Sequence, residues 1–193
     1  MKKLILSGEI GCGKSTMIRT ALGSAAARAG GFVTLRRTDG AEVLGFDLAS
    51  VEIWTNPEAE RERFLDFSAS PRRDDGVFSG LGVRLLTQAL DCPFAVLDEF
   101  GGLEMRVPEF RDALYALLES EVPCIGVLKT PAALGTMARR ITPGDACIRE
   151  YEAIRRFLEQ RDDVRILPVH TWQDRYIPSI LCRWAETYAG GEP

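Results

Sequence analysis

The sequence predicts one α/β domain over residues 1–193, with helices on both faces of a mostly parallel sheet. Short apolar runs alternate with longer segments of helical spacing, which is typical of parallel strands joined by right-handed crossovers. The length of 193 residues suits a single domain. Asp39-Gly40 separates two segments of alternating polarity, so we expect an antiparallel hairpin at one edge of the sheet.

Four regular elements are expected before residue 50. They are a strand over 3–7, a helix over 15–29 and hairpin strands over 32–37 and 42–49. Residues 54–76 are polar and rich in turn signals, so we expect a mobile excursion there with one short helix near 58–64.

The rest of the chain repeats the alternation of helices and strands. Pro108 stands where proline is favoured, at the first position of a helix. The expected elements are helices over 81–90, 109–120, 132–138, 145–160 and 178–188, and strands over 94–97, 123–128 and 164–169.

Composition and charge narrow the function classes. The chain is 46% hydrophobic and 27% charged, as in ordinary globular proteins. Its formal charge of −4 creates no positive field for binding nucleic acid, and no apolar run approaches the ~20 residues of a membrane span. Five scattered cysteines and one histidine, His170, disfavour a disulfide framework, a zinc site and a histidine-based triad. We expect a cytoplasmic protein without nucleic-acid or membrane partners.

A phosphate-binding motif lies between the first expected strand and the first expected helix. It reads Gly8-Glu9-Ile10-Gly11-Cys12-Gly13-Lys14-Ser15-Thr16 and matches G-x-x-x-x-G-K-[ST]. Glycines let backbone N–H groups turn toward a phosphate, and the dipole of the helix favours the same anion. We expect all nine residues to bind nucleotide, Lys14 to neutralise the β- and γ-phosphates and Ser15 to ligate Mg²⁺. The alternative is a glycine-rich turn that begins a helix without a ligand.

Two carboxylates follow the strand expected over 94–97. Asp98 and Glu99 would lie at the carboxyl edge of the parallel sheet, beside the phosphate loop. We expect Asp98 to hold Mg²⁺ with Ser15, and Glu99 to orient or deprotonate an attacking water. A strand that merely ends in a charged loop is the alternative. With the phosphate loop, this pattern predicts a P-loop NTPase three-layer sandwich.

The chain resembles the cancer-related nucleoside-triphosphatase family, small P-loop enzymes that hydrolyse several nucleoside triphosphates. The resemblance rests on Gly31-Phe32-Val33-Thr34 with Gly45-Phe46-Asp47, on Asp98-Glu99-Phe100-Gly101-Gly102-Leu103-Glu104, and on Asp174-Arg175. It implies the same fold and Mg²⁺-dependent hydrolysis of ATP, GTP and other nucleoside triphosphates. Glu104 would steady the loop after Glu99, or be a surface or helix-end residue.

Two departures from that family fall where substrate could be selected. Its hairpin usually carries an acidic residue before Val-Arg, whereas this chain has Leu35-Arg36-Arg37. It tends to carry histidine where this chain has Lys129, directly after a buried strand. We expect the stem of Lys129 to contact the nucleobase or ribose. An ordinary solvated lysine is the alternative.

Several arginines are candidates for stabilising charge in the transition state. They are Arg36, Arg37, Arg72, Arg73, Arg139, Arg140 and Arg175, and we favour Arg139 or Arg140 as part of a lid. Two other functions stay open. A small-molecule kinase would bind its acceptor with residues 54–76, and a slow nucleotide-dependent switch would act on a protein partner.

Overall fold

An eight-stranded sheet organises the computed structural model, which describes residues 1–68, 70–132, 145–171 and 176–190. The strands are β1 (Lys3–Gly8), β2 (Gly30–Asp39), β3 (Glu42–Ser50), β4 (Arg61–Asp66), β5 (Arg72–Arg73), β6 (Ala95–Phe100), β7 (Cys124–Leu128) and β8 (Val164–Val169). Their order across the sheet is β5-β4-β3-β2-β6-β7-β1-β8. The strands β2, β6, β7, β1 and β8 pair in parallel, and β2 to β5 pair antiparallel.

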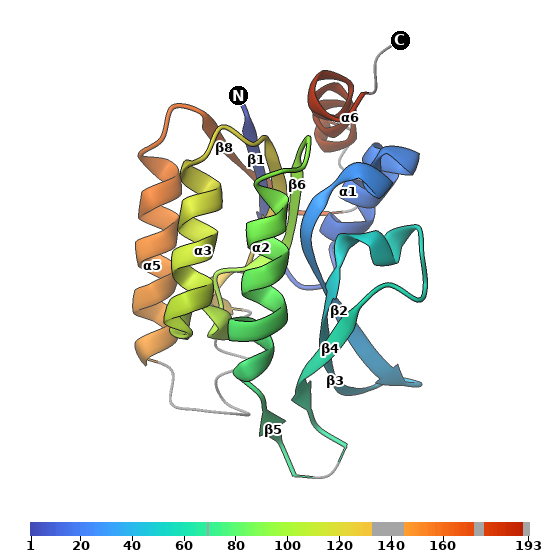
Figure 1. Ribbon diagram of the computed structural model, residues 1–193, viewed down its shortest axis with the longest axis vertical. Coiled ribbons are helices and arrows are strands. Elements are labelled where there is room, and N and C mark those ends of the chain that lie inside the picture. Colours follow the sequence, from blue (N-terminus) through green and yellow to red (C-terminus); the bar gives the residue numbers. More distant parts are fainter. Residues whose placement is uncertain (69, 133–144, 172–175, 191–193) are drawn as a thin grey trace.

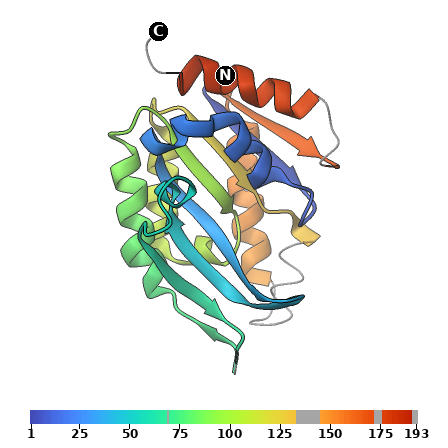
Figure 2. The same ribbon diagram turned by 90° about the vertical axis from the view of Figure 1, so that its right-hand side faces the viewer.

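Helices cover both faces of the parallel strands, as Figure 1 shows. The helices are α1 (Lys14–Leu22), α2 (Val83–Ala89), α3 (Pro108–Glu119), α5 (Asp145–Glu159) and α6 (Tyr176–Tyr188). On one side lie α2, α3 and α5; on the other lie α1 and α6, which face the viewer in Figure 2. The predicted α/β sandwich, mostly parallel with antiparallel edge strands, is therefore confirmed.

Each face of the sheet has its own apolar core. In β1, Leu4 and Leu6 pack with α1 and α6, while Ile5 packs with α2, α3 and α5. All three side chains are fully buried. Successive side chains of a strand point to opposite faces, so a strand covered on both sides reads as a continuous apolar run. This explains why the central strands were recognisable from sequence.

The short helix predicted near 58–64, within the excursion expected over 54–76, is wrong. Residues 61–66 form β4 rather than part of a helix, and β5 pairs with it. Phe64 and Leu65 are buried, and Phe46 stacks on Phe64 with ring centroids 6.3 Å apart. The open edge of β3 offers unpaired backbone groups that this segment satisfies. The hairpin is accordingly the inner half of a four-stranded antiparallel edge.

Most helix bounds match the prediction within a few residues, with one clear exception. The first helix is shorter than expected, because Gly23 adopts φ 52° and ψ −131° and ends α1 at Leu22. A 3₁₀ turn over Gly23–Arg28 continues the chain. The helix expected over 132–138 falls almost entirely outside the described residues.

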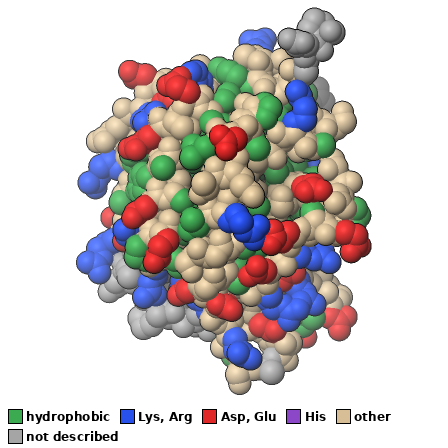
Figure 3. Space-filling model, viewed as in Figure 1, with side chains coloured by type: hydrophobic (Ala, Val, Ile, Leu, Met, Phe, Trp, Pro, Cys, Tyr) green, Lys and Arg blue, Asp and Glu red, His purple; other side chains and the backbone are tan. Residues whose placement is uncertain are grey.

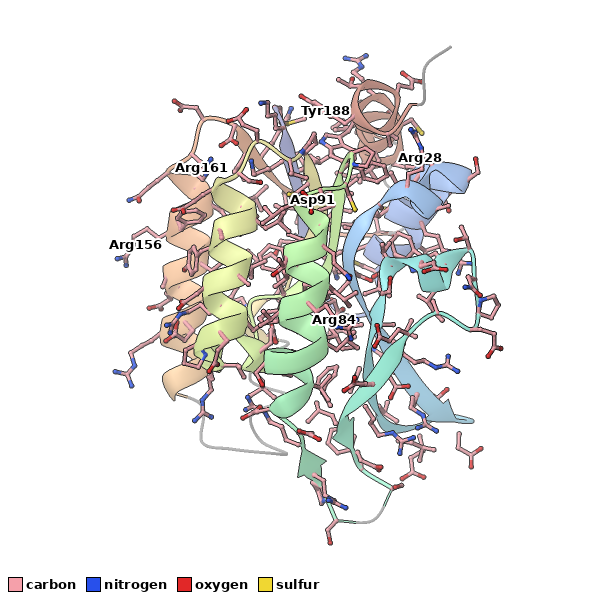
Figure 4. All side chains as sticks on the ribbon, in the orientation of Figure 1. Arg28, Arg84, Asp91, Arg156, Arg161 and Tyr188 are labelled. Atoms are coloured by element: carbon pink, nitrogen blue, oxygen red, sulfur yellow. The ribbon has the colours of Figure 1, made fainter. Side chains whose placement is uncertain are left out.

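The surface in Figure 3 mixes both charges. Arg84 of α2 pairs with Glu60 at 2.6 Å, and Arg156 of α5 is exposed (Figure 4). No helix in the described residues is long and apolar enough to cross a membrane.

Candidate active site

The phosphate loop connects β1, which ends at Gly8, to α1, which begins at Lys14. Gly11 and Gly13 have φ angles of 82° and 89°, a left-handed region that favours glycine. A Cβ atom on Gly8 would lie 2.1 Å from the carbonyl oxygen of Val169, so a side chain there would collide with β8. The glycines of the motif are therefore required by the path of the chain.

Lys14 lies inside this loop and is only 6% exposed. Its Nζ donates to the carbonyl oxygens of Gly8 and Glu9 at 2.9 and 2.6 Å. These bonds compensate a buried ammonium group within the loop itself. The side chain is thus oriented by the backbone that surrounds it, next to the N-terminus of α1.

The other residues of the motif divide into inward and outward positions. Cys12 is buried and its Sγ lies 3.7 Å from the carbonyl oxygen of Val169, whereas Ile10 is exposed at the tip of the loop. Ser15 and Thr16 belong to the first turn of α1 and line the cavity described below.

Ser15 and Asp98 meet at the carboxyl edge of the sheet. The parallel strands β1, β7 and β6 all end there, with β7 between the other two, so the start of α1 comes close to the end of β6. The Ser15 hydroxyl donates to Oδ1 of Asp98 at 2.9 Å. A hydroxyl and a carboxylate are the hard oxygen ligands that Mg²⁺ takes beside phosphate oxygens and water. Within the described residues no cluster of three His, Cys, Asp or Glu side chains forms a separate metal site. The pair fits a magnesium ion that accompanies a nucleotide.

The electrostatic environment of Asp98 also fits a cation. The side chain is almost fully buried, and burial, together with the charge of Glu99, raises the pKa of its carboxyl group to about 7. The hydrogen bond from Ser15 and the charges of Lys129 and Lys14 act in the opposite direction. A bound divalent cation would stabilise the ionised form.

Glu99 sits in a β-bulge at the end of β6. The pairing of β6 with β7 shifts between Asp98 and Phe100, and Glu99 is the one described residue other than glycine with positive φ, at 65°. Such a bulge re-aims a side chain, and bulges are common beside active sites. Asp98 and Glu99, adjacent in sequence, are thereby given different surroundings: Asp98 is buried against Ser15, and Glu99 lines an open cavity.

A buried ion pair supports the loop that follows Glu99. Lys129 and Glu104 side chains are 9% and 4% exposed, and their charged atoms are 3.3 Å apart. Glu104 accepts the backbone N–H of Gly102 at 2.6 Å, and Lys129 donates to the backbone carbonyl oxygen of Glu99. Glu104 is therefore buried next to the loop rather than on the surface. A base contact for Lys129 stays a prediction.

A cavity of about 330 Å³ joins these groups. It is lined by Gly11, Gly13, Lys14, Ser15, Thr16, Thr34, Arg36, Phe46 and Glu99. The hairpin supplies one wall, because the Thr34 hydroxyl donates to the backbone carbonyl oxygen of Asp98 at 3.2 Å. The sequence named the hairpin as a place where substrate could be selected and Arg36 as a candidate residue, but it did not predict that Thr34 and Phe46 line the cavity.

A second cavity, of about 430 Å³, adjoins the loop from the side of α1 and α6. It shares Gly11, Gly13 and Thr16 with the first, and its other walls include Met17, Ala21, Pro178 and Cys182. These walls are mainly apolar, as expected for a surface that accepts a nucleoside.

Some sequence candidates fall elsewhere. Arg73 is paired with Asp75 at 2.5 Å and donates to the carbonyl oxygen of Leu103 at 3.0 Å. Arg139, Arg140, Asp174 and Arg175 lie outside the described residues.

Comparison with known proteins places the chain among nucleotide hydrolases. The model of a family described as NTPase matches residues 3–150. The solved structure of THEP1 from the hyperthermophile Aquifex aeolicus is 20% identical to this chain in sequence, with a TM-score of 0.52. The match covers 82% of this chain and 99% of the THEP1 chain. The solved structure of a human cancer-related nucleoside triphosphatase is also 20% identical to this chain, with a TM-score of 0.51. The match covers 84% of this chain and 100% of the human chain. No curated protein matches this chain.

Proposed function

This chain belongs to the NTPase family, and on that premise we propose that it hydrolyses ATP, GTP or other nucleoside triphosphates to the diphosphate and phosphate with Mg²⁺. The observation that carries the proposal is the convergence of Lys14, Ser15 and Glu99 on one cavity, with Asp98 hydrogen-bonded to Ser15. A charge-neutralising lysine, an oxygen pair for a metal and a carboxylate for water are the groups that phosphoryl transfer to water needs.

Binding would begin at the phosphate loop. The backbone N–H groups of residues 9–15 and the N-terminus of α1 attract phosphate oxygens. The Lys14 ammonium group would exchange its carbonyl partners, Gly8 and Glu9, for the β- and γ-phosphates. Because a charged acceptor forms stronger hydrogen bonds than a neutral carbonyl, this exchange favours the bound state.

Ser15 and Asp98 would hold the magnesium ion, which supplies positive charge to the oxygens that become more negative during the reaction. Glu99 orients the attacking water and accepts its proton. The oxygen of that water forms a bond to the γ-phosphorus, and the bond between that phosphorus and the bridging oxygen breaks, so the nucleoside diphosphate leaves with the electron pair.

The nucleoside would occupy the cavity between α1 and α6, since it adjoins the loop on the side away from Glu99. Lys129 does not line this cavity, so contact of the base with Lys129 is the competing placement of the nucleoside. Michaelis constants of Lys129→Ala for ATP, GTP, CTP and UTP test it. Changes that differ between the four nucleotides, and that correspond to a binding free energy on the order of 1 kcal/mol, support a base contact. Changes of equal size for all four nucleotides contradict it.

The decisive experiment measures phosphate release from purified protein with nucleoside triphosphate and Mg²⁺ alone. Turnover under these conditions supports the hydrolase. Strict dependence on a second small molecule would instead indicate a kinase, and very slow turnover accelerated by a protein would indicate a switch. A cytoplasmic location belongs to the same proposal and is supported by the unpaired thiols of Cys12, Cys92, Cys124 and Cys182.

A further inference from the structure

The hairpin brings one arginine into the phosphate cavity. Of the candidate arginines within the described residues, Arg36 lines this cavity, whereas Arg37, Arg72 and Arg73 do not. Arg36 and Thr34 are two residues apart on β2 and therefore share a face of the strand. That face points to the end of β6, because the Thr34 hydroxyl bonds to the carbonyl oxygen of Asp98 at 3.2 Å.

Aromatic packing orients Arg36. The residue lies opposite Phe46 in the β2–β3 ladder, and its guanidinium carbon lies 6.0 Å from the centroid of the Phe46 ring. Phe46 is held by Phe64 and Phe67, with centroids 6.3 and 6.4 Å away. The antiparallel strands thus provide a fixed aromatic surface under the guanidinium group.

The charge of Arg36 is available to a ligand. Arg36 is exposed, and among the described residues no carboxylate forms an ion pair with it. The neighbouring cavity residues Lys14 and Glu99 lie on the wall formed by α1 and β6. A γ-phosphate between Lys14 and the hairpin would therefore have a second cation on its outer side.

We propose that Arg36 is a catalytic residue that donates guanidinium N–H groups to the γ-phosphoryl oxygens as negative charge spreads over them. It forms no covalent bond and exchanges no proton. The arginine completes the proposed hydrolase from within the same chain, so this inference rests on the proposed function.

Turnover of Arg36→Ala tests the proposal directly. We expect kcat for Mg·ATP to fall by about 10³-fold, the lower end of the range for arginines in phosphoryl transfer, with a change below roughly threefold in affinity for a non-hydrolysable analogue. Arg36→Lys keeps one charge without the planar donor pair and should recover only part of the loss. Free guanidinium added to Arg36→Ala should restore measurable turnover.

Arg37→Ala is the matched control, because Arg37 is adjacent in β2 and does not line the cavity. Its kcat should stay within about twofold of the wild type. Equal losses in Arg36→Ala and Arg37→Ala, or a kcat of Arg36→Ala within twofold of the wild type, would overturn the proposal.

A second measurement separates this proposal from the hydrolase itself. Calorimetry compares binding of ADP with Mg²⁺ and aluminium fluoride, a mimic of the transferring phosphoryl group, with binding of a non-hydrolysable triphosphate. Arg36→Ala should lose at least tenfold more affinity for the mimic than for the triphosphate, whatever the turnover. Equal losses would refute the role of Arg36, whereas absence of phosphate release by the wild type would refute the proposed function.

Discussion

The two loops that face each other across the site are stabilised in different ways. The phosphate loop from Gly8 to Ser15 depends on main-chain geometry, with glycines at positive φ and close backbone contact with β8. The loop from Asp98 to Glu104 depends on side-chain charge, because the buried Lys129–Glu104 pair binds its backbone at Glu99 and Gly102. The conformation of the first loop is accordingly sensitive to side chains added at its glycines. The second loop is sensitive to removal of the charged side chains that bind its backbone.

Glu99 should give the largest effect on the reaction. In Glu99→Gln the amide keeps the shape of the side chain but cannot accept a proton, so we expect kcat to fall by about 10²–10⁴-fold. Binding of Mg·ATP, measured by calorimetry, should be retained. Wild-type turnover would show that the bulge does not serve to place Glu99 for catalysis.

Loss of one member of the buried ion pair should destabilise the protein. Lys129→Met leaves Glu104 buried without its cation, and we expect the free energy of unfolding to fall by about 3 kcal/mol in denaturant titrations. The double variant Lys129→Met with Glu104→Gln should recover part of this loss. A matched control is Lys2→Met, since Lys2 pairs with the exposed Glu121 and its replacement should leave the free energy of unfolding nearly unchanged.

Lys14 tests the other loop. Lys14→Ala removes the ammonium group but leaves the glycine conformations in place, so affinity for Mg·ATP should fall by about 10- to 100-fold, the value of a hydrogen bond to a charged group. Calorimetry measures the affinity, and circular dichroism should show an unchanged fold. Unchanged affinity would contradict the assignment of the phosphate loop.

Asp98 should give an effect on stability that depends on pH. Its pKa is about 7 in the folded protein and near 3.8 when unfolded, so the folded state holds the proton more tightly between these values. The contribution of this group to the free energy of unfolding is therefore complete below pH 4, and it is lost as the pH rises through 7. Without Mg²⁺, Asp98→Asn should therefore raise the free energy of unfolding at pH 8, and the melting temperature with it.

The comparison that checks this prediction is the difference between Asp98→Asn and the wild type across pH 5–8. The stabilisation should shrink as the pH falls. A difference that is independent of pH would mean that Asp98 does not titrate in this range.

The sequence by itself determined the parallel core, the phosphate loop and the order of the functional groups along the chain. Strands buried on both faces are continuous apolar runs, as at β1 and β6, and the glycine and lysine spacing of 8–15 follows from local geometry. Both signals lie within a few consecutive residues, so no distant contact is needed to recognise them.

Only the tertiary structure decided the outer strands, the bulge at Glu99 and the contents of the cavity. Residues 61–66 have no strong strand pattern and become β4 because β3 leaves an open edge. The bulge depends on the register between β6 and β7. The ion-pair partner of Glu104 is Lys129, 25 residues away in the sequence. Arg36 enters the site through the pairing of β2 with β3 and β6. These features arise from contacts between segments far apart in sequence, which local patterns do not encode.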